Sequence, residues 1–160
     1  MMITDWRDLQ TGLLLTGEAE TLTAGEWIGR QIAPNQSIAI SGAMGNGKTT
    51  LSKGIAAGWG VCTTVKSPTY NYFLTYQTDR GLLVHLDAYR LAGPDEYDSL
   101  LIEDILEEPW LLLVEWPEHV PGCLPLPRIH LTMDSAGEGK RRLTLRTDDL
   151  GATPPNQPLS

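Results

Sequence analysis

Gly42-Ala43-Met44-Gly45-Asn46-Gly47-Lys48-Thr49 has the spacing G-x-x-x-x-G-K-S/T, which is that of the phosphate-binding P-loop. A short β-prone run at 37–41 precedes it, and the apolar residues of the following segment, 50–59, recur near helical spacing. A strand, a glycine-rich loop and a helix in this order form the structural context that a P-loop requires. The sequence therefore predicts a site for a nucleoside triphosphate.

Each residue type in this loop has a physical role. The glycines allow the backbone to bend around an anion and to direct successive N–H groups inward, and the helix N-terminus adds its positive dipole end. Lys48 is expected to reach the β- and γ-phosphates, and the Thr49 hydroxyl is expected to bind Mg²⁺. The chain has no Asn-Lys-x-Asp motif, which reads guanine, and this favours ATP over GTP.

Composition limits the class of protein. A chain of 160 residues with 41% hydrophobic content is most simply one globular domain with a sizeable core. Its 12 Lys and Arg residues against 20 Asp and Glu residues give a net charge of −8, and the one dense basic run is Lys140-Arg141-Arg142. Nucleic-acid-binding proteins usually present a basic face. We therefore expect no high-affinity nucleic-acid surface of its own, although a partner could bring RNA nearby.

The sequence also favours a cytoplasmic protein that makes no contact with a membrane. No apolar run approaches the roughly 20 residues that span a bilayer. Asp5 and Asp8 lie where a signal peptide would be basic and then apolar. Cys62 and Cys123 lack metal-site spacing, which is typical of free thiols in a reducing compartment.

Two helices are predicted outside the P-loop segment. Thr23-Ala24-Gly25-Glu26 has the pattern of a capping box, followed by an apolar stripe that Pro34 ends. Trp27, Ile28 and Ile32 form this stripe. Gly93-Pro94-Asp95-Glu96 begins an acidic helix that should run to about Leu106, with Tyr97, Leu100, Leu101 and Ile105 on one side.

The strand pattern completes the predicted fold. The apolar run Trp110–Val114, closed by Glu115, is typical of a strand buried on both faces. The other predicted strands are 71–76 and 82–87, joined by a turn at 79–81, and 128–133 and 141–146, which form a hairpin. Together these elements predict an α/β fold: a P-loop NTPase-like sheet of parallel and antiparallel strands flanked by helices. We expect a single domain over residues 1–150 and a disordered, proline-rich tail over residues 151–160.

A P-loop domain needs a second magnesium ligand, direct or through water, usually an acid at the end of a buried strand. Asp87 and Glu115 both end such strands, and the residues alone do not rank them. His85 could position a water or a phosphate, or be a half-buried structural histidine. Arg90 could balance transition-state charge, or pair with Glu96. Trp116 is core or, as the adjacent proline and acids suggest, an aromatic residue at the rim.

With these residues in view, the chain resembles the TsaE (YjeE) family of bacterial P-loop ATPases, which serves tRNA threonylcarbamoyladenosine modification. The resemblance covers about residues 10 to 146 and rests on four segments in order. They are Gly42–Thr50, Ser67-Pro68-Thr69-Tyr70, His85-Leu86-Asp87-Ala88-Tyr89-Arg90-Leu91 and Val114-Glu115-Trp116-Pro117. One departure lies inside the P-loop: Ala43-Met44 stands where the family commonly has an acid and an apolar residue.

The resemblance implies roles for residues that spacing alone does not assign. Thr49 and Glu115 would bind Mg²⁺, and Asp87 would be a catalytic or water-positioning acid. Lys48 and Glu115 would be the other catalytic residues. The helix start around Glu18 and the turn at Gly139 and Lys140 would approach the nucleoside. Two segments would act as switches or partner contacts, together with Trp116: Ser67, Pro68, Thr69 and Tyr70 in the first, and His85, Tyr89 and Arg90 in the second. The nucleotide itself would lie on Gly42, Gly45, Asn46, Gly47, Lys48, Thr49 and Thr50.

The implied function is that of an ATP-binding and ATP-hydrolysing component of the complex that forms threonylcarbamoyladenosine next to the tRNA anticodon. Its partners would be proteins of the TsaD and TsaB type, with tRNA reached only through them. Hydrolysis would reset the assembly and would be slow without partners. Two alternatives stay open at this point. One is a small-molecule P-loop kinase, although the chain has few arginines for a lid, and the other is a non-catalytic nucleotide-gated adaptor.

Overall fold

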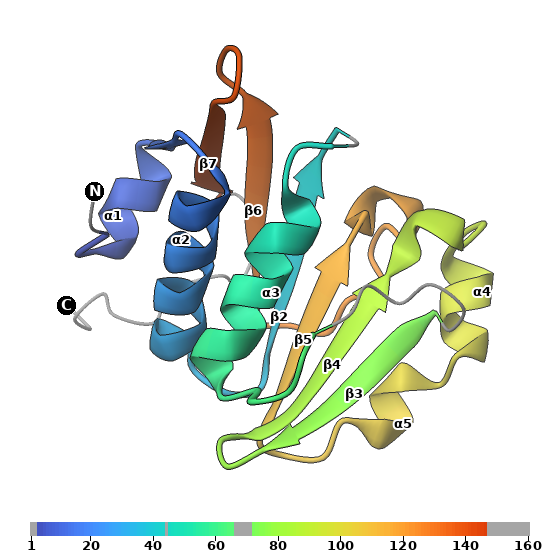
Figure 1. The fold of residues 1–160 in the computed structure, drawn as a ribbon. Helices are drawn as coiled ribbons and strands as arrows, with labels where there is room; N and C mark the ends of the chain where they lie inside the picture. The colour runs from blue at the N-terminus through green and yellow to red at the C-terminus, as the bar shows by residue number, and fades with distance from the viewer. Residues whose placement is uncertain (1–2, 44, 66–71, 147–160) are drawn as a thin grey trace, which may run out of the picture.

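The computed structural model describes residues 3–43, 45–65 and 72–146, and its centre is one seven-stranded sheet (Figure 1). The strand order is β1-β7-β6-β2-β5-β4-β3. The four central strands β6, β2, β5 and β4 run parallel, and the strands at both edges pair antiparallel. The bounds are β1 Leu13–Leu15, β2 Gln36–Gly42, β3 Phe73–Thr78, β4 Gly81–Asp87, β5 Trp110–Glu115, β6 Arg128–Ser135 and β7 Arg141–Arg146. The predicted mixed sheet of a P-loop NTPase-like fold is confirmed.

Two hydrophobic clusters cover the two faces of this sheet. One packs the helices α1 (Trp6–Gln10), α2 (Glu18–Gln31) and α3 (Lys48–Trp59) against the strands. The other packs α4 (Pro94–Ser99) and α5 (Ile102–Ile105), with the turns at Ala88–Arg90 and Pro117–His119. As predicted for a strand covered on both faces, every residue of β5 is buried.

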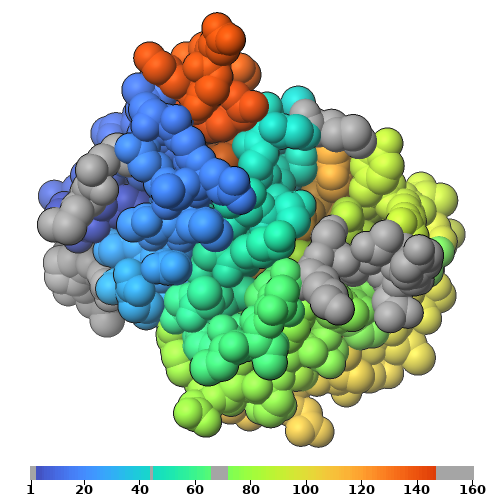
Figure 2. All heavy atoms as spheres, viewed as in Figure 1, coloured from blue at the N-terminus to red at the C-terminus, as the bar shows by residue number. Residues whose placement is uncertain are grey.

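Glycines allow α2 and α3 to touch backbone to backbone. Figure 2 shows the two helices, blue and teal, side by side on one face of the molecule. A Cβ atom added to Gly29 would lie 2.1 Å from the Ile55 carbonyl oxygen, and one added to Gly58 would lie 2.1 Å from the Glu26 carbonyl oxygen. Gly25 and Gly54 make the same kind of contact one turn earlier. Only glycine allows this approach, because any Cβ atom would meet the backbone of the opposite helix.

Arg80, in the turn between β3 and β4, contacts the C-terminal end of this helix pair. Its Nη1 donates to the Gly29 carbonyl (2.6 Å) and its Nη2 to the Ile32 carbonyl (2.9 Å). Its guanidinium also lies 4.2 Å from the centre of the Trp59 ring in α3. The side chain thus satisfies backbone acceptors at the C-terminus of α2 that the helix itself leaves unpaired.

The predicted capping box is wrong. Helix α2 begins before it, at Glu18, with Gly17 as the N-cap and no capping side chain. Thr23 lies inside the helix, where its hydroxyl donates to the Ala19 carbonyl (3.0 Å). The pattern of a hydroxyl residue followed by Glu three positions later fits a helix interior equally well when the hydroxyl bonds back to its own helix. The helix ends at Gln31, before Pro34 as predicted.

The predicted acidic helix is interrupted. It forms two short helices, α4 and α5, because Leu101 between them adopts a left-handed conformation with φ of 55°. Leu101 is 61% exposed, so it does not belong to the buried side on which Tyr97 and Ile102 lie. The first strand after the P-loop helix spans Phe73–Thr78, and the predicted hairpin of β6 and β7 is confirmed.

Some predictions fall outside the described residues. These concern the segment Ser67–Tyr70 and the tail 151–160, and Met44 of the P-loop also lies outside them. Among the residues that are described, no helix is long and apolar enough to cross a membrane.

Gly29→Ala should destabilise the protein by about 2 kcal/mol, because overpacking against fixed backbone outweighs the helix propensity of alanine. Urea denaturation measures this free energy of unfolding. Gly93→Ala is the matched control, since its backbone is extended and an added Cβ atom would meet nothing within 4 Å. Equal unfolding free energies for the two variants would contradict the backbone contact between α2 and α3.

Candidate nucleotide site

The P-loop leaves β2 at Gly42 and enters α3 at Lys48, and glycines provide its turns. Gly45 and Gly47 have φ angles of 79° and 86°, in the region that favours glycine. Lys48 is only 5% exposed, and its Nζ donates to the carbonyl oxygens of Gly42 (2.6 Å) and Ala43 (2.8 Å). Burial lowers the pKa of Lys48, an effect that the nearby carboxylates oppose. The lysine therefore lies across the loop that is expected to hold the phosphates.

Trp116 covers the same lysine from the other side. The Nζ atom of Lys48 lies 4.0 Å from the centre of the Trp116 ring, the geometry of a cation–π contact. Trp116 in turn contacts Tyr89 and His119, with ring centres 5.1 and 5.8 Å away, and Tyr89 is 47% exposed. This aromatic cluster connects the P-loop to the surface of the protein, and Trp116 lies at its partly buried inner end.

The structure distinguishes the two candidate acids. Asp87 and Glu115 are paired positions at the carboxyl ends of β4 and β5. Of the two, Glu115 makes a hydrogen bond to the described part of the P-loop: its Oε1 accepts from the Thr49 hydroxyl (3.0 Å). Its Oε2 accepts from His85 Nε2 (2.6 Å). Asp87 instead accepts from the backbone N–H of Tyr89 (3.1 Å).

The two acids also differ in electrostatics. Burial, to which the charge of Glu115 adds, raises the pKa of Asp87 above its ordinary value. For Glu115, burial acts in the same direction, but the hydrogen bonds from His85 and Thr49 and the charge of Lys48 outweigh it and lower the pKa. Glu115 is therefore an ionised carboxylate at neutral pH, although it is 2% exposed.

The pair Thr49 and Glu115 fits a magnesium ion. Mg²⁺ prefers oxygen ligands, and neighbouring ligands of its octahedron lie about 3 Å apart, given bonds of about 2.1 Å. The Thr49 hydroxyl and the Glu115 carboxylate oxygen have this chemistry and this separation. In protein sites Mg²⁺ is usually held by one or two carboxylates together with the phosphates of the substrate.

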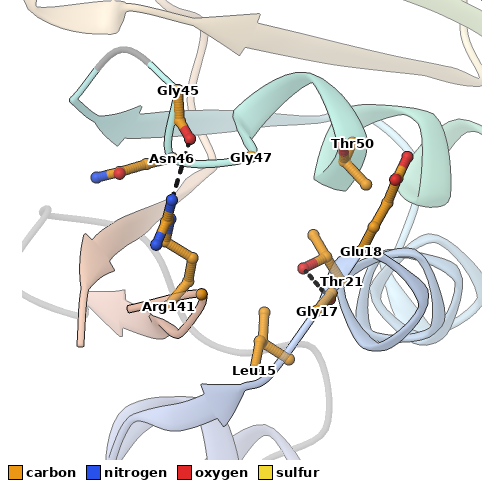
Figure 3. Close-up of a pocket in the computed structure, with 10 residues that line it drawn as sticks. Leu15, Gly17, Glu18, Thr21, Gly45, Asn46, Gly47, Thr50 and Arg141 are labelled. Atoms are coloured by element: carbon orange, nitrogen blue, oxygen red, sulfur yellow. Dashed lines mark hydrogen bonds between the residues drawn. The ribbon is translucent and has the colours of Figure 1, made fainter. Parts of the chain in front are cut away.

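Two cavities meet at the P-loop. The first, of about 260 Å³, lies between the N-terminus of α2, the P-loop and the β6–β7 hairpin (Figure 3). Figure 3 shows Glu18 and Thr21 on one side and Arg141, which donates to the Gly45 carbonyl (3.3 Å), on the other. The full lining is Leu15, Gly17, Glu18, Thr21, Gly45, Asn46, Gly47, Thr50, Gly139 and Arg141. Glu18 and Gly139, distant in sequence, are thus brought together beside the loop.

The second cavity, of about 350 Å³, contains Lys48 and the two candidate acids. It is lined by Lys48, Thr49, Asp87, Glu115 and Trp116, and it shares Gly45, Gly47 and Thr50 with the first. The shared residues make the two cavities neighbours on either side of the P-loop. An elongated ligand could therefore occupy both cavities and cross the P-loop between them.

Several sequence-level expectations change at the site. His85 is fully buried, not half-buried, and it lines neither cavity. Arg90 is exposed and makes no ion pair with Glu96 within the described residues; the Glu96 carboxylate accepts from Ala92 N–H (2.6 Å) and from the Tyr72 hydroxyl (3.2 Å). The segment Ser67–Tyr70 lies outside the described residues.

Sequence reasoning did not identify Leu15, Thr21, Arg141 or His119 as neighbours of the site. Arg141 belongs to the basic run noted above, but nothing in the sequence places that run beside the P-loop. His119 follows Trp116 closely, and this proximity was the only available signal.

Glu115→Gln should abolish most of the gain in ADP affinity that Mg²⁺ provides, because the Glu115 carboxylate lies against the Thr49 hydroxyl. Asp87→Asn should retain that gain. Calorimetric titration of ADP, once with Mg²⁺ and once with EDTA, measures it for each variant. The reverse pattern, with loss in Asp87→Asn alone, would contradict this assignment of the two acids.

Comparison with known proteins agrees with these features. The family model "Threonylcarbamoyl adenosine biosynthesis protein TsaE" matches residues 15–143. Proteins named tRNA threonylcarbamoyladenosine biosynthesis protein TsaE are similar to the chain. The one from Rickettsia felis is 32% identical over 137 residues (85% of this chain and 80% of the relative), and the one from Haemophilus influenzae is 34% identical over 112 residues (70% and 71%).

A solved structure is also similar. The crystal structure of Bacillus subtilis YdiB superposes with a TM-score of 0.65 at 27% sequence identity, covering 84% of this chain and 82% of that one. The family model spans most of the chain, and its match includes the P-loop, both acids and the wall of the first cavity. The chain belongs to the TsaE family.

Proposed function

We propose that this protein is the ATP-binding and ATP-hydrolysing component of the complex that forms threonylcarbamoyladenosine next to the anticodon of tRNA. The observation that carries the proposal is the contact of Thr49 with Glu115 in the second cavity, which Lys48 also lines. The names of the relatives supply the pathway. The P-loop fold of the family supports a nucleotide-binding role.

The two cavities suggest how ATP would lie. The nucleoside would occupy the cavity at Glu18, Thr21 and Gly139, and the phosphates would lie on the P-loop. Lys48 would then exchange the carbonyls of Gly42 and Ala43 for phosphate oxygens. This exchange costs little backbone change, because the lysine already lies across the loop.

Thr49 and Glu115 would hold Mg²⁺, which neutralises the charge that develops on the phosphates. Asp87 lines the same cavity as Lys48, and we assign it the role of orienting the attacking water. Burial raises the pKa of Asp87 above its ordinary value, which favours proton exchange with that water. No arginine lines this second cavity among the described residues, so slow hydrolysis by the isolated protein is expected.

Partner proteins of the TsaD and TsaB type would accelerate this step, and hydrolysis would reset them between rounds of threonylcarbamoyl transfer. The cluster of Tyr89, Trp116 and His119 lies where such a partner could sense the position of Lys48. The net charge of −8 is consistent with tRNA being bound by the partners. We place this work in the cytoplasm, with Cys62 and Cys123 as free thiols.

Two other functions remain testable alternatives. A small-molecule kinase would transfer the phosphate to an acceptor hydroxyl, and a screen for phosphorylated acceptors would reveal it. A nucleotide-gated adaptor would bind ATP without hydrolysis, so that phosphate release would stay at background with every partner present.

Lys48→Ala should lower partner-stimulated ATP hydrolysis by about 100-fold or more, because one preorganised charge-stabilising donor typically contributes that much. Phosphate release, measured with the TsaD- and TsaB-type partners and tRNA present, checks this. Lys53→Ala, an exposed lysine on the same helix, is the matched control and should retain the wild-type rate. Equal rates for Lys48→Ala and the wild type would refute the proposal.

A further inference from the structure

His85 is an imidazole placed inside an apolar layer. It lies on β4, in register with Leu74 of β3 and Leu113 of β5, and its exposed fraction is 0%. Leu83 and Leu113, on the same face of the sheet, belong to the hydrophobic cluster beneath α3. Because His85 lines neither cavity, it cannot touch a nucleotide there. Any contribution that it makes to the site must pass through another side chain.

Glu115 is that side chain. The 2.6 Å bond from His85 Nε2 to Glu115 Oε2 is short for a nitrogen donor, as expected when the acceptor is ionised. A carboxylate only accepts hydrogen bonds, so Nε2 carries the proton. The other ring nitrogen, Nδ1, is buried and has no hydrogen-bond partner among the described residues.

Stability alone does not account for this arrangement. Buried polar pairs can often be replaced by apolar residues of similar volume with no loss of stability, and a buried nitrogen without a partner adds a further cost. His85 instead fixes the orientation of the Glu115 carboxylate. The bond to Oε2 leaves Oε1 directed at the Thr49 hydroxyl, 3.0 Å away, and rotation of the carboxylate would break that bond.

We propose that His85 is a positioning residue that holds the Glu115 carboxylate with one oxygen facing the magnesium site. This inference rests on the proposed function, in which Glu115 and Thr49 bind Mg²⁺. Hydrogen-bond partners behind metal ligands typically change metal affinity by 10–100-fold.

The test measures how binding of a fluorescent ADP analogue depends on Mg²⁺ concentration, so that hydrolysis plays no part. His85→Leu should raise the Mg²⁺ concentration for half-maximal binding by about 10-fold or more. Its affinity for the analogue in EDTA should stay within about twofold of the wild type. His130→Gln is the matched control, a histidine on the parallel strand β6 that bonds Ser41 on the opposite side of the sheet from α3. It should leave the Mg²⁺ midpoint unchanged.

Conservative replacements of His85 distinguish the loss of its hydrogen bond to Glu115 from the loss of side-chain volume. The side-chain amide of Gln can place an N–H close to the position of His Nε2, whereas Asn can place one only near Nδ1. His85→Gln should therefore retain a Mg²⁺ midpoint near that of the wild type, and His85→Asn should not. This comparison decides the question even if His85→Leu does not fold. Equal midpoints for the Gln and Asn variants would overturn the inference.

A double-mutant cycle tests whether the effect passes through Glu115. In the Glu115→Gln background, adding His85→Leu should cause no further shift of the Mg²⁺ midpoint. A further shift as large as in the wild-type background would overturn the inference and leave the proposed function intact. If wild-type binding did not depend on Mg²⁺ at all, the metal site of the proposed function would fail, and this inference with it.

Discussion

The backbone contact between α2 and α3 is the constraint on which the candidate site depends. Gly25 lies against Gly54, and Gly29 lies against Gly58, so the two helices run parallel and in register. The two helices therefore begin side by side, and this brings the start of α2 against the P-loop. The starts of both helices line the first cavity, together with the β6–β7 hairpin. Arg80 secures the opposite end of the pair by binding carbonyls of both helices.

The parallel strands β2, β5 and β4 supply the second constraint. Parallel pairing places their carboxyl ends at one edge of the sheet. The P-loop starts at this edge, and Glu115 and Asp87 are the last residues of β5 and β4 there. Helix α3 starts at the same edge, so Thr49 reaches Glu115 directly. His85 lies two residues before Asp87 on β4 and hence on the same face of the sheet. Its imidazole contacts Glu115 inside the hydrophobic core.

Local signals in the sequence predicted the elements that depend on local physics. The strand before the P-loop, the helix after it, the buried strand β5 and the β6–β7 hairpin all have strong apolar patterns or turn residues. The start of α2 was mispredicted at Thr23, because a glycine N-cap has no side-chain signature. The interruption at Leu101 was missed, because apolar spacing does not report the backbone angle of a single residue.

The sequence by itself determined the chemistry of this protein: a phosphate-binding loop, its lysine and threonine, two acids that end buried strands, and the segments that mark its family. Tertiary structure decided which of these groups meet. It placed Glu115 and not Asp87 against Thr49, buried His85 behind that carboxylate, and joined Glu18 and Gly139 across one cavity. Such contacts depend on strand order, register and helix packing. These are properties of residues far apart in the chain, and a local pattern does not encode them.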